Sequence, residues 1–303
     1  MTILVRRSNL LVRVADAAAV SSAWRHNADA ITLDLEGADA GARGRVREAI
    51  ATAAQGAAEV FVKINPATLS VDLDVTVWPG VRGVMLAAVS SAPEVRVAEQ
   101  NIAALEHNRG LPKNSLQLIV VLGTAASVWD VRAIVTASTR ISQVVIDEQA
   151  LAADLDINPL PEFDPFVYAR GRVVVEAIAA KVMPVGIAYP LSVQTHAASP
   201  EEIQTLAVKG KNLGMKGGLC PDPAWVAPVN AAYTPTPELV TYNKRVREAF
   251  AAGVAAGTAA VPLDGRMIDV PVDEWAIVVL ATAEACAARD AEKQAAVSSL
   301  TKA

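Results

Sequence analysis

Short apolar stretches alternate with amphipathic stretches of helical length along most of the chain. The apolar stretches are rich in Val, Ile and Leu, which is typical of strands that are buried on both faces. Eight of them are predicted as strands: residues 8–14, 31–35, 60–65, 83–88, 116–122, 141–147, 185–189 and 217–220.

The intervening amphipathic stretches predict helices. They cover residues 16–26, 43–54, 93–107, 125–137, 164–180 and 200–213. Regular alternation of this kind indicates parallel strands joined by right-handed crossovers. Eight such units predict an α/β fold, a closed TIM (β/α)8 barrel, over residues 1–230. An open doubly wound sheet is the structural alternative, but the glycine-rich phosphate turn that it often carries is absent from the sequence.

Residues 231–303 follow the last predicted strand and exceed what a minimal barrel needs. A helix is predicted from Pro235 to about Gly253, because proline is favoured in a first helical turn. An acidic turn around Asp264 and a final helix come next. We expect this C-terminal helical extension to pack on the barrel or on a neighbouring subunit.

Composition narrows the possible partners. Hydrophobic residues make up 52% of the 303 residues and the net charge is -5, so electrostatics gives no support for nucleic-acid binding. Cys220 and Cys286 have neither metal-ligand nor disulfide-framework spacing. The first residues lack the apolar core of a signal peptide, and the apolar stretch at 249–263 is too short to span a bilayer. A cytoplasmic protein with no membrane partner is expected.

Candidate chemistry lies where the predicted strands end, since barrel active sites form at the carboxyl ends of the strands. Asp34 and Glu36 follow the second strand, and side chains two positions apart on a strand point to the same face. Paired buried carboxylates need a metal, a basic group or a substrate beside them. They could equally hold backbone amides, for example at the start of the next helix. Arg13 ends the first strand, and Lys63 and Asn65 end the third.

Several motifs resemble those of the HpcH/HpaI aldolase and citrate lyase β-subunit family, which includes malyl-CoA and citramalyl-CoA lyases. The motifs, in chain order, are Asp34-Leu35-Glu36, Lys63-Ile64-Asn65-Pro66, Tyr168-Ala169-Arg170, the segment GLCPDPAWVAPVN at 218–230, YTPTP at 233–237 and Arg266-Met267-Ile268-Asp269. They cover about 260 residues in the family's order.

This resemblance implies a TIM barrel that assembles as a homotrimer or hexamer, binds Mg²⁺ and makes or breaks carbon–carbon bonds in acyl-CoA thioesters. Lys63 stands where the family has an arginine that helps to bind the keto acid, and a lysine lacks the planar fork of that arginine. Asp269 matches an aspartate that acts across a subunit boundary.

The sequence departs from the family at both positions that the resemblance implies as direct metal ligands. Gly123 replaces the glutamate after the fifth strand, and Ala150 replaces the aspartate after the sixth. Mg²⁺ is therefore expected from the family, but no metal site is predicted in this chain.

Three functions are consistent with these features. The first is a carbon–carbon lyase or aldolase that acts on a hydroxyacyl-CoA or related keto-acid substrate with altered or lost metal dependence. Here Asp269, Glu36 and Lys63 are the predicted catalytic residues, and Asp34, Lys63, Asn65 and Arg13 are predicted to bind the substrate. The second is a non-catalytic paralogue that serves as a subunit or binding module, alone or in a hetero-oligomer with an active homologue. The third is an acyl-CoA thioesterase that uses Asp269.

Overall fold

The computed structural model describes residues 3–158, 163–186 and 199–300. The chain divides into two compact units. One comprises residues 6–233 and 296–303, and the other residues 1–5 and 234–295. Part of the predicted seventh strand, residues 187–189, lies outside the described residues.

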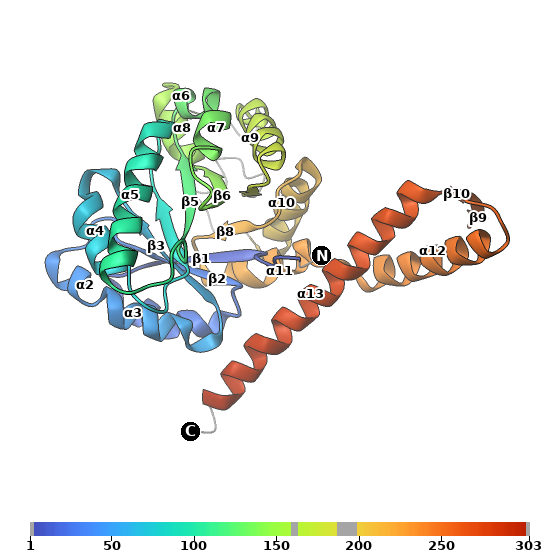
Figure 1. Ribbon diagram of the computed structural model, residues 1–303, viewed down its shortest axis with the longest axis horizontal. Coiled ribbons are helices and arrows are strands. Elements are labelled where there is room, and N and C mark those ends of the chain that lie inside the picture. Colours follow the sequence, from blue (N-terminus) through green and yellow to red (C-terminus); the bar gives the residue numbers. More distant parts are fainter. Residues whose placement is uncertain (1–2, 159–162, 187–198, 301–303) are drawn as a thin grey trace. The chain divides into compact units, whose positions relative to one another are not determined.

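Eight parallel strands form the centre of the first unit (Figure 1). They are β1 (Ser8–Arg13), β2 (Ala30–Asp34), β3 (Glu59–Ile64), β4 (Gly83–Leu86), β5 (Gln117–Leu122), β6 (Ile141–Ile146), β7 (Met183–Val185) and β8 (Gly218–Cys220). The hydrogen-bonded order runs β7-β6-β5-β4-β3-β2-β1-β8. Lys216 N donates to Pro184 O at 2.9 Å and Gly186 N to Gly217 O at 2.8 Å, and these bonds join the two ends of the sheet. The predicted (β/α)8 barrel is confirmed.

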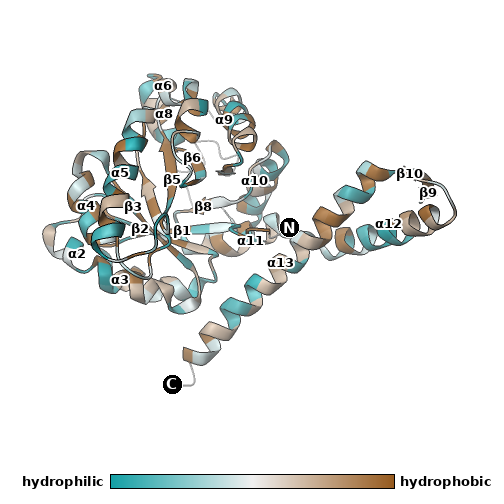
Figure 2. Cartoon of the chain, viewed as in Figure 1, coloured by the Kyte–Doolittle hydropathy of each residue, from teal (hydrophilic) through white to brown (hydrophobic). Residues whose placement is uncertain are grey.

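Helices cover the outside of these strands, and most of them carry both hydrophilic (teal) and hydrophobic (brown) residues (Figure 2). They are α1 (Ala17–Ser22), α2 (Ala40–Gly44), α3 (Val46–Ala53), α4 (Leu69–Thr76), α5 (Ala92–Asn108), α6 (Ala125–Trp129), α7 (Val131–Val135), α8 (Glu148–Asp154), α9 (Val167–Ala179), α10 (Pro200–Leu213) and α11 (Val226–Tyr233). The predicted helix at 43–54 is interrupted at Arg45. α4, α8 and α11 were not predicted, because seven or eight residues are too few to establish a helical period.

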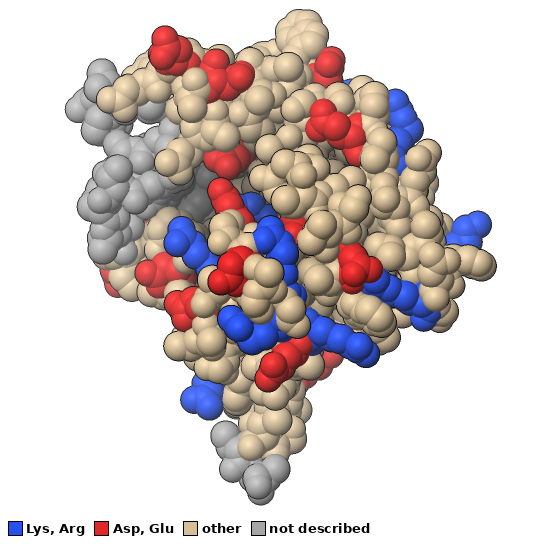
Figure 3. Space-filling model, turned by 90° about the vertical axis from the view of Figure 1, so that its left-hand side faces the viewer, with Lys and Arg blue, Asp and Glu red and all other residues tan. Residues whose placement is uncertain are grey.

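Charges on the surface are mixed in sign. Figure 3 shows acidic side chains next to the basic ones over the face in view. A continuous basic area, which is typical of nucleic-acid binding, does not occur on that face. None of the helices in the described parts of the chain combines the length and the hydropathy of a membrane-spanning segment.

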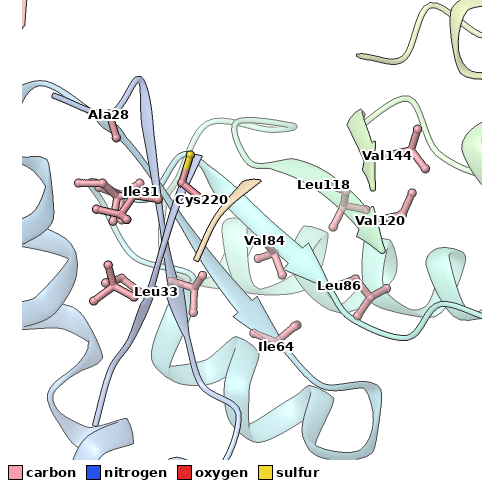
Figure 4. Close-up of a cluster of buried hydrophobic side chains, with 14 of the residues drawn as sticks. Ala28, Ile31, Leu33, Ile64, Val84, Leu86, Leu118, Val120, Val144 and Cys220 are labelled. Carbon is pink, nitrogen blue, oxygen red and sulfur yellow. The ribbon is translucent and has the colours of Figure 1, made fainter. Parts of the chain in front are cut away.

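Alternate residues of the strands form two cores. Those that face outward, including Ile31, Leu33, Val84 and Leu118, pack against the helices and are fully buried (Figure 4). Those that face inward form a smaller cluster around Phe61. This alternation explains why the strands appear continuously apolar in the sequence.

A buried arginine closes the amino-terminal end of the barrel. The Arg6 guanidinium forms an ion pair with Glu59 and donates to Gln117 Oε1 at 2.7 Å. Its side chain is fully buried. Three of its neighbours, Glu59, Gln117 and Ser142, lie at the starts of three strands, so one side chain ties these strands together.

The second unit contains two helices and a hairpin. They are α12 (Pro237–Ala255), β9 (Val261–Leu263), β10 (Arg266–Ile268) and α13 (Val270–Leu300), of which the residues up to Ala295 belong to this unit. The two helices confirm the helical extension that the sequence predicts. The hairpin was not predicted as strands, although Asp264 and Gly265 both adopt the positive φ that a tight hairpin turn requires. That this unit packs on the barrel or on a neighbour stays a prediction.

Replacing Arg6 by Met should lower the free energy of unfolding by about 3 kcal/mol, because Glu59 would lose its buried partner. Urea denaturation of the full chain measures this loss. Arg82→Met is the matched control, since Arg82 pairs with the same Glu59 at 3.0 Å but is 43% exposed. It should cost less than about 1 kcal/mol. Equal effects of the two variants would contradict a special role for the buried arginine.

Candidate active site

A cavity of about 430 Å³ opens at the carboxyl ends of the barrel strands. It is lined by residues from most strands and from the loops and helices that follow them: Leu11, Lys63, Met85, Val121, Val145, Ile146, Asp147, Glu148, Gln149, Arg170, Val185, Gly186, Met215, Leu219, Pro221 and Trp225. This volume lies within the range of about 300–1,000 Å³ that is usual for small-molecule sites.

Apolar side chains make the floor of the cavity. Six of the eight strands contribute them: Leu11, Met85, Val121, Val145 with Ile146, Val185 and Leu219. The remaining two strands, β2 and β3, have Asp34 and Lys63 near their carboxyl ends instead, and these two residues are register partners. The polar chemistry of the floor is therefore confined to one pair of neighbouring strands.

The structure brings together three of the residues predicted for the site. Lys63 Nζ donates to Asp34 Oδ2 at 3.0 Å and to Glu36 Oε2 at 2.7 Å. The other Asp34 oxygen, Oδ1, accepts the backbone N–H of Glu36 at 2.9 Å. Asp34 is buried, whereas the Glu36 side chain is 72% exposed. Asp34 thus has the basic partner that a buried carboxylate requires, and Glu36 binds the same ammonium from the exposed side.

The hydrogen bonds and charges within this cluster shift the pKa values of Lys63 and Glu36. Burial alone would lower the pKa of Lys63, but the hydrogen bond to Glu36 and the charge and hydrogen bond of Asp34 outweigh it and raise that pKa above its ordinary value. The hydrogen bond from Lys63 and its charge lower the pKa of Glu36. Lys63 is consequently a cation and Glu36 an anion at neutral pH.

One N–H of the Lys63 ammonium remains for a ligand. A lysine ammonium has three donors, and the described residues supply acceptors for two of them, on Asp34 and Glu36. Because Lys63 lines the cavity, the third donor is available to a bound molecule.

A second polar cluster forms one wall. Arg170 in α9 binds Glu148 through two nitrogens, with Nη2 donating to Oε2 at 2.8 Å, and it also pairs with Asp164. Burial raises the pKa of the Glu148 carboxyl despite the opposing effect of Arg170. Asp147 caps α8 by accepting the backbone N–H groups of Gln149 and Ala150. Both acids next to β6 therefore already have protein partners.

The residues present do not fit a Mg²⁺ ion. Hard divalent cations require several carboxylate or carbonyl oxygens, but the Asp34 and Glu36 carboxylates are bound to Lys63. Gly123 and Ala150 are adjacent: a Cβ added to Gly123 would lie 2.9 Å from the Ala150 Cβ. A side chain at position 123 would therefore require one of the two segments to shift, and the described residues contain no cluster of three metal-ligating side chains.

The other three predicted residues make no hydrogen bond to Lys63 in the described part of the chain. Arg13 is exposed at the end of β1 and helps to lower the pKa of Glu36 through its charge. The Asn65 side chain accepts the backbone N–H of Ala67. Asp269 is exposed in the second unit, where Oδ1 accepts the Val272 N–H at 3.3 Å.

Sequence reasoning did not assign four residues of the cavity wall to the site: Glu148, Arg170, Met215 and Trp225. Arg170 lies in the Tyr168-Ala169-Arg170 motif and Glu148 follows a strand end, so both carried a usable signal. Met215 and Trp225 lie on segments whose position over the cavity depends on the closed barrel, which no local pattern encodes.

The sequence and the fold of this chain are both similar to those of known proteins from one family. The profile of the family described as HpcH/HpaI aldolase/citrate lyase matches residues 7–223. The citrate lyase subunit beta of Escherichia coli K12 is 28% identical over 293 residues, covering 94% of this chain and 95% of the relative. The L-malyl-CoA/beta-methylmalyl-CoA lyase of Cereibacter sphaeroides (strain ATCC 17025) is 25% identical, covering 85% and 88%. The CitE protein of Mycobacterium tuberculosis, solved with magnesium, acetoacetate and coenzyme A, shares the fold with a TM-score of 0.69 at 22% identity, over 92% of this chain and 98% of that one.

The pKa of Lys63 should fall in Glu36→Gln, because burial still disfavours the ammonium while one anionic partner is lost. In the native chain the pair contributes its full stabilisation between about pH 4.5 and 10.5. It is lost as the pH rises through the raised pKa of Lys63 or falls through the lowered pKa of Glu36. NMR titration of ¹³Cε-labelled lysines measures the shift, and Lys63→Met assigns the signal. An unchanged titration of Lys63 in Glu36→Gln would disprove the coupling.

Mg²⁺ should produce no micromolar binding isotherm in calorimetry, because neither Gly123 nor Ala150 supplies an oxygen and Lys63 competes for the two carboxylates. Gly123→Glu should not restore binding, since its Cβ would collide with Ala150. Micromolar affinity in the native chain that is abolished by Glu36→Ala, and retained in the control Asp130→Ala, would overturn this expectation.

Proposed function

We propose that this chain is a carbon–carbon lyase for a hydroxyacyl-CoA or related keto-acid substrate and that it works without a metal ion. The chain belongs to the HpcH/HpaI aldolase/citrate lyase family. The observation that carries the proposal is the Lys63 ammonium, which lines the cavity with one N–H still open to a ligand. Relatives named as lyases of citrate and malyl-CoA support the reaction class.

Lys63 would supply the positive charge of the site. Cleavage of a β-hydroxyacyl thioester between Cα and Cβ leaves an electron pair that the thioester takes up as an enolate. A preformed donor aimed at the developing charge lowers the barrier without reorganisation. The third N–H of Lys63 would donate to the enolate oxygen, while Asp34 and Glu36 hold the ammonium in position. An ammonium whose charge two carboxylates balance is a weaker electrophile than Mg²⁺, so we expect slow turnover.

Asp269 is the proposed acid–base group. Its carboxylate would take the proton of the β-hydroxyl as the Cα–Cβ bond breaks and the β-carbon becomes a carbonyl. The same proton would return to Cα, so that one hydroxyacyl thioester gives one acyl thioester and one carbonyl compound. Asp269 is exposed and has one long side-chain hydrogen bond, to Val272 N, among the described residues, which leaves its second oxygen for this task. It would act from a neighbouring subunit.

A non-catalytic binding subunit is the second candidate. Two observations favour it. The charge of Lys63 is already balanced by two carboxylates, and Gly123 lies so close to Ala150 that a Cβ at position 123 would collide with the Ala150 Cβ. In that case the barrel would keep its cavity and bind a thioester without turnover, alone or beside an active homologue.

The decisive assay is turnover of β-hydroxyacyl-CoA esters with and without EDTA. We expect EDTA-insensitive cleavage that Lys63→Met lowers by about 10²–10³-fold and Asp269→Asn by about 10²–10⁴-fold. Undiminished activity of Asp269→Asn would remove this residue from the mechanism. Release of free CoA without a carbonyl product would indicate the thioesterase. Absence of turnover on every ester would favour the non-catalytic subunit.

We also propose assembly as a homotrimer or hexamer. The second unit exposes large apolar side chains on β10 and α13, namely Met267, Trp275, Ile277 and Val278. An exposed apolar face of this size commonly marks an interface. Sedimentation velocity at micromolar concentration should give a trimer or hexamer, and Trp275→Glu should shift it toward the monomer. A monomeric native chain would refute the assembly.

A further inference from the structure

The charges that line the cavity are balanced, with Asp147 and Glu148 against Lys63 and Arg170. The groups that pair with these cations add three acids, Asp34, Glu36 and Asp164, and Arg13 beside Glu36 adds one cation. Five carboxylates against three cations leave two negative charges in excess among the described residues.

Both cations that line the cavity already have carboxylate partners. Lys63 binds Asp34 and Glu36, and Arg170 binds Glu148 and Asp164. A carboxylate on the ligand would have to compete with two protein carboxylates at either cation. It would also lose its own hydration on a floor made of apolar side chains.

We propose that this cavity selects an uncharged, apolar acyl group, so that the carbonyl fragment released by cleavage is a neutral aldehyde or ketone and not a keto acid. The open N–H of Lys63 suits a neutral carbonyl or enolate oxygen, which needs one donor, better than it suits a carboxylate. Apolar walls with a few placed polar groups are the usual form of such a pocket.

The chemistry of the reaction stays balanced. A β-hydroxyacyl thioester with an alkyl group on Cβ loses its hydroxyl proton, breaks the Cα–Cβ bond and regains the proton at Cα. It yields an acyl thioester and an aldehyde or ketone, with no oxidant or second substrate. This step rests on the proposed lyase function, whereas the preference for an uncharged group rests on the cavity alone.

Binding tests the ligand class without catalysis. Butyryl-CoA and succinyl-CoA both have four-carbon acyl groups and lack a β-hydroxyl, so neither can undergo this cleavage. In calorimetric titration of the full chain, butyryl-CoA should bind at least about tenfold more tightly, because succinyl-CoA adds a carboxylate. Equal or tighter binding of succinyl-CoA, or binding of neither ester, would overturn the proposal.

Turnover tests the reaction with an equally close pair. 3-Hydroxy-3-methylbutyryl-CoA and citramalyl-CoA differ only in a methyl or a carboxylate on Cβ, and we expect the first to have the higher kcat/KM by about tenfold or more. A preference for citramalyl-CoA would reject the neutral product and leave the lyase function standing. Selective butyryl-CoA binding without turnover of either ester would reject the lyase function and leave the ligand class standing.

Variants that alter charge test the cause of the preference. Leu219→Lys adds a cation to the floor, and Asp147→Asn removes an acid while keeping an oxygen to cap α8. Both should shift the binding ratio of the two esters toward succinyl-CoA by several-fold. Asp130→Asn removes an exposed acid that does not line the cavity and should leave the ratio unchanged. Identical ratios in all three folded variants would refute the electrostatic explanation.

Discussion

The ammonium group of Lys63 is the interaction on which the site depends. A buried carboxylate at the end of β2 would be costly without a partner, and β3 provides one directly across the register, from Lys63 to Asp34. Glu36, two residues after Asp34, forms the second ion pair with Lys63. Removing the lysine would leave the Asp34 charge unbalanced against the apolar floor. Barrel geometry and the chemistry of the site are thus coupled through a single side chain.

Much of the fold could be predicted because its signals are local. Eight apolar stretches alternate with helical stretches, and the strands are buried on both faces, as Leu33 on the outer face and Phe61 on the inner face illustrate. The helices that were missed are short, and the hairpin around Asp264 has strands of only three residues. Neither the helical period of 3.6 residues nor the alternation of a strand can be recognised over so few positions.

The site was predicted less completely, since its geometry depends on strands that are distant in sequence. Asp34, Glu36 and Lys63 were all identified from strand ends, and the structure places them in one cluster. Arg170 and Glu148 form a second pair that only the closed barrel brings to the same cavity. No spacing in the sequence indicates that Arg170 would bind Glu148, or that Asn65 would be used to cap a turn.

The close approach of Gly123 to Ala150 has a consequence for protein engineering. In this backbone, a Cβ at position 123 meets the Ala150 Cβ at 2.9 Å, so any residue larger than glycine there requires the chain to move. Installing an oxygen ligand at position 123 therefore takes more than one substitution, because the segments that carry residues 123 and 150 would first have to separate. A redesign of this end of the barrel has to begin with the backbone and not with the side chain.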